Sequence, residues 1–111
     1  MKKYMAMYMA PAATIAEVMK GTPEQMKSGM DEWMKWSEKN KKGVLDLGAP
    51  LGKTMRVTPS GMSPTKNEIT GFTVVQADSF DDAAKMFKDH PHLKLKGATV
   101  DILEYFPMQG M

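Results

Sequence analysis

Residues 70–108 read TGFTVVQADSFDDAAKMFKDHPHLKLKGATVDILEYFPM, and this stretch decides the fold. Apolar and polar residues alternate over residues 70–77, which predicts a strand. Ser79, followed three residues later by Asp82, is a helix start signal directly after that strand. The sequence therefore predicts a strand that feeds without a linker into a helix over Phe80–Asp89.

The same stretch then predicts a tight corner and a second strand. Pro91 ends the helix at a His90-Pro91-His92 corner, because proline lacks the amide proton that a continuing helix needs. After Gly97 the run ATVDILEYF alternates again and predicts a strand over residues 98–106. This last strand must pair with strands formed earlier in the chain.

The N-terminal half supplies those earlier strands and a long helix. Thr22-Pro23-Glu24-Gln25 is a capping box with proline at the first helical position, so a helix should begin there and end before Gly43. The remaining predicted elements are a strand over Lys3–Ala10, a weak helix over Ala12–Lys20, a short strand over Val44–Leu47, an edge strand or the return arm of a hairpin over Lys53–Thr58, and a loop over Ser63–Asn67.

The core order is thus strand, helix, strand, strand, helix, strand. We expect an α+β fold of the ferredoxin-like βαββαβ type, with a four-stranded antiparallel sheet and the helices on one face. A chain of 111 residues is long enough for one hydrophobic core, so residues 1–111 are predicted to form a single domain.

Composition excludes several classes of function. The chain has 15 Lys and Arg against 13 Asp and Glu, so charge indicates neither a nucleic-acid nor a membrane partner. It has no cysteine and therefore no disulfide or thiolate chemistry. The N-terminal run could serve as a short signal peptide, but a buried first strand is favoured because Pro11 closes the apolar run early. We expect a cytoplasmic protein, by elimination.

The first predicted strand also predicts assembly. Its alternate residues are Met5, Met7 and Met9 on one face and Tyr4, Ala6 and Tyr8 on the other, so neither face carries a charge. Helices can cover only one face of the sheet, and soluble monomers rarely expose a large apolar patch. We expect a homodimer through the sheet face. The alternative is that the loops around Pro50 and Pro64 cover it.

The thirteen methionines are interpreted as packing residues. Met26 and Met30 share a helical stripe with Trp33 and Met34, which predicts that this side of the long helix faces the core. Trp36 lies at the margin of that stripe and is predicted to line the mouth of a ligand pocket. Arg56, the only arginine, could clamp a carboxylate-bearing ligand, although a surface arginine on an edge strand is the simpler interpretation.

His90 and His92 are the only histidines and the main candidates for chemistry. Two ligands are too few for a metal site, and no further group with ligand spacing completes one, so no metal and no cofactor are expected. His92 could act as a general base with a carboxylate such as Asp46 or Asp101. The structural alternative is that His90 caps its helix as an imidazolium and His92 fixes the corner by a hydrogen bond.

Three segments invite a comparison with a known family. They are Gly43–Leu51, Ile69–Ser79, and Pro91-His92-Leu93 with Gly97–Val100, and together they resemble the YCII-related (DGPF-like) family over nearly the whole chain. The resemblance implies the dimeric α/β-barrel superfamily, whose members include isomerases, dehalogenases and cofactor-free monooxygenases. Of the family-like positions, Asp46 and His92 offer proton-transfer groups.

Two functions follow from the sequence. The first is a cofactor-free enzyme acting on a small molecule, with His92 and Asp46 as catalytic residues and Arg56, Trp36 and His90 contacting the ligand. The second is a non-catalytic dimeric module that binds a small ligand or is associated with stress. A pocket lined by His92 and a carboxylate within hydrogen-bond reach would favour the enzyme, and a His92 bonded only to backbone would favour the module.

Overall fold

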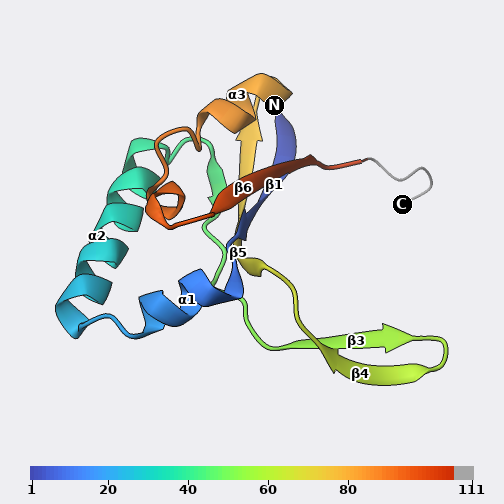
Figure 1. Cartoon of the computed structure of the whole chain (residues 1–111). Coiled ribbons are helices and arrows are strands. Elements are labelled where there is room, and N and C mark those ends of the chain that lie inside the picture. Colours follow the sequence, from blue (N-terminus) through green and yellow to red (C-terminus); the bar gives the residue numbers. More distant parts are fainter. Residues whose placement is uncertain (107–111) are drawn as a thin grey trace.

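A computed structural model describes residues 1–106 of the chain (Figure 1). The strands are β1 (Lys2–Met9), β2 (Val44–Asp46), β3 (Thr54–Thr58), β4 (Gly61–Thr65), β5 (Ile69–Ala77) and β6 (Thr99–Glu104). The helices are α1 (Ala12–Met19), α2 (Pro23–Lys39), α3 (Phe80–Lys85) and the short 3₁₀ helix η1 (Pro91–Lys94).

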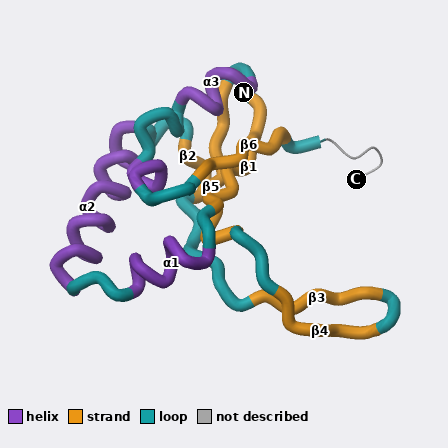
Figure 2. The backbone as a smooth tube through the Cα atoms, in the orientation of Figure 1, coloured by secondary structure: helices purple, strands orange, loops and turns teal. Residues whose placement is uncertain are grey.

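Four strands form one antiparallel sheet in the order β2-β5-β1-β6. This α+β arrangement, with α2 and α3 against one face, is consistent with the ferredoxin-like fold (Figure 2). β3 and β4 pair only with each other and form a separate hairpin that is inserted between β2 and β5. The expectation of one domain over residues 1–111 stays a prediction, and residues 107–111 lie outside the described part.

Local signals explain where the helices begin. The Thr22 hydroxyl accepts a hydrogen bond from the Gln25 amide at 3.1 Å, and the Gln25 side chain accepts one from the Thr22 amide at 2.9 Å. This is the predicted capping box, which satisfies two amides at the start of α2. At α3, the Ser79 hydroxyl accepts from the Asp82 amide at 3.1 Å, as the start signal indicated.

The core lies between the sheet and the helices. Tyr4, Ala6 and Tyr8 of β1 are buried there, so the tyrosine face of this strand points to the helices. The cluster also contains Trp36, Val75, Ala77, Ala83 and Phe87. Met5, Met7 and Met9 consequently lie on the opposite face of the sheet, where they are half-buried.

Two boundary predictions are corrected by the structure. α3 ends at Lys85 rather than Asp89, and the chain continues through turns to η1. The segment predicted as a loop over Ser63–Asn67 instead contributes Ser63–Thr65 to β4, because these residues pair with β3 in a hairpin. The strand predicted over Lys53–Thr58 is confirmed as β3, but it is the first arm of a hairpin with β4 and not an edge strand of the main sheet or a return arm.

The predicted core role of the methionines on α2 is wrong. Met26, Met30 and Met34 are all exposed, Met30 with 68% of its surface. The buried residue of α2 is Trp36, which is 5% exposed. Spacing on a helix shows which residues share a face but not what that face meets.

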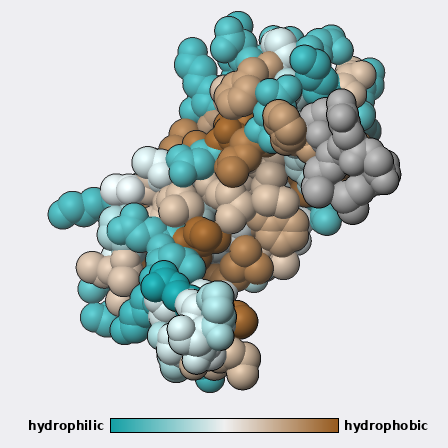
Figure 3. All heavy atoms as spheres, turned by 90° about the vertical axis from the view of Figure 1, so that its right-hand side faces the viewer, coloured by the Kyte–Doolittle hydropathy of each residue, from teal (hydrophilic) through white to brown (hydrophobic). Residues whose placement is uncertain are grey.

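The face of the sheet away from the helices carries Met5, Met7, Phe72, Val74 and Leu103 at facing register positions. Seen from that side, hydrophobic side chains gather across the middle of the molecule (Figure 3). The predicted dimer through this face stays a prediction. No helix within residues 1–106 has the length and apolar character needed to cross a membrane.

Candidate functional site

A pocket of about 420 Å³ lies between α2 and the end of the sheet where β5 begins. One wall is the methionine side of α2 with Trp33, and the other is formed by β5, by Tyr8 of β1 and by the loop after β2. The lining residues are Tyr8, Met26, Gly29, Met30, Trp33, Met34, Leu47, Gly48, Ala49, Pro50, Thr70, Gly71 and Phe72. None of these residues carries a charge, so the pocket is apolar.

Glycines give this pocket its shape. Gly48 has φ of +78°, and a Cβ atom there would lie 1.8 Å from the Phe72 carbonyl oxygen. Only glycine fits such a position, which brings residues 47–50 against β5 as one wall. Gly29 on α2 has the opposite property, since a Cβ atom there would meet nothing within 4 Å. It therefore leaves open space in the wall that faces the sheet.

The pocket side of β1 is backed by a chain of hydrogen bonds through the buried Tyr8. The Thr73 hydroxyl donates to the Leu47 carbonyl oxygen at 2.9 Å, so the Tyr8 hydroxyl, 2.7 Å from Thr73 Oγ1, must donate to it. His90 Nδ1 accepts from the His92 amide at 3.0 Å, so the proton of neutral His90 is on Nε2. That group then donates to the Tyr8 oxygen at 3.2 Å.

Burial determines the protonation of this chain. It lowers the pKa of His90 to about 3, with the nearby charge of His92 as a smaller cause. It raises the pKa of Tyr8 to about 12, against the opposite effect of the hydrogen bond with Thr73. At neutral pH His90 is therefore uncharged and Tyr8 keeps its proton. The prediction that His90 caps its helix as an imidazolium is wrong for this reason. In this series of hydrogen bonds, the polar hydrogens of His90, Tyr8 and Thr73 are all donated to acceptors within the protein.

The structure does not bring His92 and Asp46 together. The His92 Nε2 atom donates to the Met9 carbonyl oxygen at 2.9 Å, whereas Asp46 is exposed and accepts from the Gly48 amide at 2.9 Å. Asp46 lies opposite Val74, which pairs with Met5, four residues along β1 from Met9. Strand geometry puts Asp46 roughly 15 Å from Met9, the residue to which His92 is hydrogen-bonded. Neither His92 nor Asp46 lines the pocket.

The two tryptophans have the opposite positions from those predicted. Trp36 is buried, donates from Nε1 to the Met86 carbonyl oxygen at 2.9 Å, and packs on Phe87 with ring centroids 4.9 Å apart. The pocket is lined instead by Trp33, which contacts Tyr8 edge-on at 4.7 Å. The buried side of α2 is thus the side that packs against Phe87 and His90, which follow α3. Helical spacing alone does not specify which side this is.

Arg56 and His90 also lie outside the pocket lining. Arg56 is exposed on β3, opposite Ser63 in the hairpin, as the simpler interpretation of a surface arginine expected. His90 is buried behind Tyr8, with ring centroids 4.9 Å apart. It can affect the pocket through Tyr8 and through Trp33, whose ring centroid lies 4.4 Å from that of His90.

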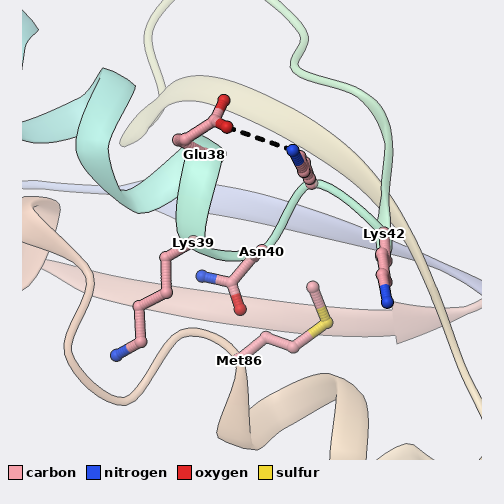
Figure 4. A pocket seen from close by; sticks show the side chains of 7 residues that line it. Glu38, Lys39, Asn40, Lys42 and Met86 are labelled. Carbon is pink, nitrogen blue, oxygen red and sulfur yellow. Dashed lines mark hydrogen bonds and ion pairs between the residues drawn. The ribbon is translucent and has the colours of Figure 1, made fainter.

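A second hollow, of about 320 Å³, lies at the end of α2 (Figure 4). Met86 lies beside the polar residues 38–42 and Gly43. Glu38 and Lys41 form an ion pair at 3.3 Å, and Lys39 and Lys42 point away from each other. No set of polar groups converges there, so the apolar pocket is the better candidate.

Sequence reasoning missed Tyr8 and Thr73 as site residues. The sequence did contain a signal, because Tyr8 and Thr73 each place a hydroxyl group on the buried face of a strand. Two buried hydroxyl groups on neighbouring strands require partners, and the simplest partner is each other. The open space at Gly29 could not be predicted from the sequence, because it depends on how α2 packs against the sheet.

No family model matches the chain, and no curated protein matches its sequence. Among solved structures, it is similar to 5-chloro-2-hydroxyhydroquinone dehydrochlorinase from Burkholderia phenoliruptrix AC1100, in a complex with 2,5-dihydroxybenzoquinone. The identity is 14%, the TM-score is 0.48, and the match covers 91% of each chain. The resemblance to the YCII-related family therefore stays a prediction.

Proposed function

We propose that this protein binds a small, uncharged, ring-containing molecule in the pocket between α2 and β5. The observation that carries the proposal is the lining, in which thirteen residues include no charged side chain. The two hydroxyl groups among them are already used, since Tyr8 donates to Thr73 and Thr70 donates to the Tyr8 carbonyl oxygen at 3.1 Å. A charged ligand would lose its hydration there without gaining a partner.

The size and surface of the pocket support a ring compound. Its volume of about 420 Å³ lies in the range of small-molecule sites. Trp33 and Tyr8 supply aromatic surface on the helix side of the sheet, and flexible methionines on α2 can adapt to the ligand. A flat molecule of one or two rings suits this combination.

The bonding of the candidate catalytic residues supports a binding protein over an acid-base enzyme. His92 donates to a backbone carbonyl and Asp46 accepts from a backbone amide, so both are used to hold turns. A general base needs to be within hydrogen-bond reach of the proton that it removes from the substrate. Since neither residue lines the pocket, the non-catalytic alternative is the function that we propose.

Isothermal titration calorimetry with a matched pair of probes tests this proposal. We expect 2-naphthol, which is neutral, to bind with a dissociation constant on the order of 100 µM. We expect 2-naphthoate, which has the same rings and a charge, to bind at least about tenfold more weakly. Equal affinity for the two probes would show that the apolar lining does not select the ligand.

A pair of variants on α2 locates the binding site. Gly29→Leu fills the open space in the pocket wall and should abolish 2-naphthol binding, because the new side chain takes the ligand's volume. Ser28→Leu adds the same side chain at the neighbouring exposed position outside the lining and should leave binding unchanged. Circular dichroism checks that both variants fold. Unchanged binding in Gly29→Leu would exclude this pocket as the site.

A further inference from the structure

We propose that the β3–β4 hairpin is an arm that packs on a second copy of this chain, and that two copies exchange arms. The hairpin spans Thr54–Thr65 and belongs to a two-stranded sheet of its own. It extends from the end of the main sheet, on the side away from α2 (Figure 1). The inference does not depend on the pocket or its ligand.

The register gives the hairpin an apolar face and a polar face. Met55 pairs with Pro64 and Val57 pairs with Met62, so these four side chains lie on one face. Met55, Val57 and Met62 are 56%, 71% and 74% exposed. The opposite face carries Thr54, Arg56, Thr58, Ser63 and Thr65.

Such a hairpin needs a partner. An isolated two-stranded hairpin is marginally stable in water, and a third strand or another packed element is normally required. The hydroxyl groups of Thr54 and Thr58 bond within the hairpin and its adjoining loops, so they do not tie it to the main sheet. The apolar face is therefore a surface that this protomer leaves uncovered.

Each chain also carries a second uncovered apolar surface, which the sheet and the arm of a partner can cover together. The face of the main sheet away from the helices is apolar, with Met7 opposite Phe72 and Met5 opposite both Val74 and Leu103. The arm extends on that same side (Figures 1 and 3). In a twofold pair each copy supplies one arm and receives one, so that both kinds of apolar surface are covered with none left over.

The dimensions agree with this arrangement. Two sheets packed face to face lie about 10 Å apart. Five strand residues extend about 17 Å, so an arm that starts at one sheet reaches beyond the second sheet. The arm would then lie along the partner's sheet edge with its apolar face inward.

Charge favours a second copy over a basic partner. Residues 51–67 contain Lys53, Arg56 and Lys66 and no acidic residue. The apolar face of the main sheet carries an exposed carboxylate, Asp101, opposite Met7. Lys53 and Lys66, which flank the two strands of the arm, are the cations that can approach this carboxylate, because Arg56 lies on the polar face of the hairpin.

Sedimentation velocity tests the arm with two matched triple variants. We expect the wild-type chain to be a dimer at 100 µM and Met55→Thr/Val57→Thr/Met62→Thr to raise the dimer dissociation constant at least about a hundredfold, because each change acts twice in a dimer. Threonine keeps the preference for strand structure. Thr54→Ser/Ser63→Thr/Thr65→Ser alters the polar face of the same hairpin and should leave the dimer intact. A monomeric wild-type chain, or a dimer that the first variant does not weaken, would overturn the proposal.

Site-directed crosslinking gives a readout that does not depend on stability. Because the chain lacks cysteine, Ser60→Cys places a single thiol at the arm tip for a maleimide-linked photocrosslinker. We expect a covalent product of about twice 12.4 kDa. Glu17→Cys on the exposed side of α1 should give none. Crosslinking only within one chain at the arm tip would contradict an exchange of arms.

Discussion

Acidification from pH 7 to pH 5 should destabilise this protein through His90. The side chain is 1% exposed and packs against Tyr8, Trp33, Trp36 and Phe87, so the folded protein resists adding a charge there. The titratable groups facing it are Tyr8, which accepts its Nε2 proton, and His92, whose amide donates to its Nδ1. Burial lowers the pKa of His90 in the folded protein to about 3.

The sign and size follow from the difference between the two states. In the unfolded chain His90 has its ordinary pKa of about 6.5 and takes up a proton as the pH falls below that value. The folded protein does not take it up until the pH nears 3, so the free energy of unfolding falls through this window. At about 1.4 kcal/mol for each pH unit, we expect a loss of about 2 kcal/mol between pH 7 and pH 5.

Urea unfolding at fixed protein concentration, followed by circular dichroism at half-unit pH steps, measures this loss. His90→Gln removes the titration, so its free energy of unfolding should be lower at pH 7 but nearly constant down to pH 5. His92→Gln is the matched control and should keep most of the pH dependence, because burial is the larger cause of the low pKa of His90. If the wild-type protein and His90→Gln lose stability in parallel, the reasoning about buried His90 is refuted.

Three further predictions concern stability, each measured by urea unfolding. Gly48→Ala should cost about 3 kcal/mol or more, because the new Cβ atom would collide with the carbonyl oxygen of Phe72 and the backbone conformation is unfavourable for alanine. An undiminished unfolding free energy would show that the loop after β2 can move away. Trp36→Phe should cost about 1–3 kcal/mol, since the Met86 carbonyl oxygen loses its indole donor, and a neutral effect would mean that another donor replaces it. Thr22→Ala should cost about 1 kcal/mol through the lost helix cap, and a Thr22→Ser control should retain most of the stability.

Much of the fold could be predicted because its signals are local. The capping box at Thr22 and the cap at Ser79 specify helix starts by hydrogen bonds between residues three apart. The alternation of β1 and β5 specified strands, since side chains alternate between the two faces of a sheet. With short connections, these elements leave few ways to form one core, and the predicted antiparallel four-stranded sheet is the one observed.

The site was less predictable because it depends on contacts between distant segments. His92 and Asp46 were paired by chemical type, but the first holds the corner at Met9 and the second holds the turn at Gly48. The hydrogen-bond chain through Tyr8 joins residues 65 and 82 positions apart. No short-range sequence pattern predicts hydrogen bonds between residues so far apart in the chain.

The sequence by itself determined the elements of the main sheet, the starts of α2 and α3, their order and the two-faced character of the first strand, because helix caps and strand alternation depend on neighbouring residues. Only the tertiary structure decided which face of each element is inside. It buried Trp36 in place of the methionines of α2, opened the pocket beside Gly29, and left the apolar side of the β3–β4 hairpin uncovered. The reason is physical: periodicity records which side chains share a face, whereas the packing of separate elements against one another sets what that face contacts.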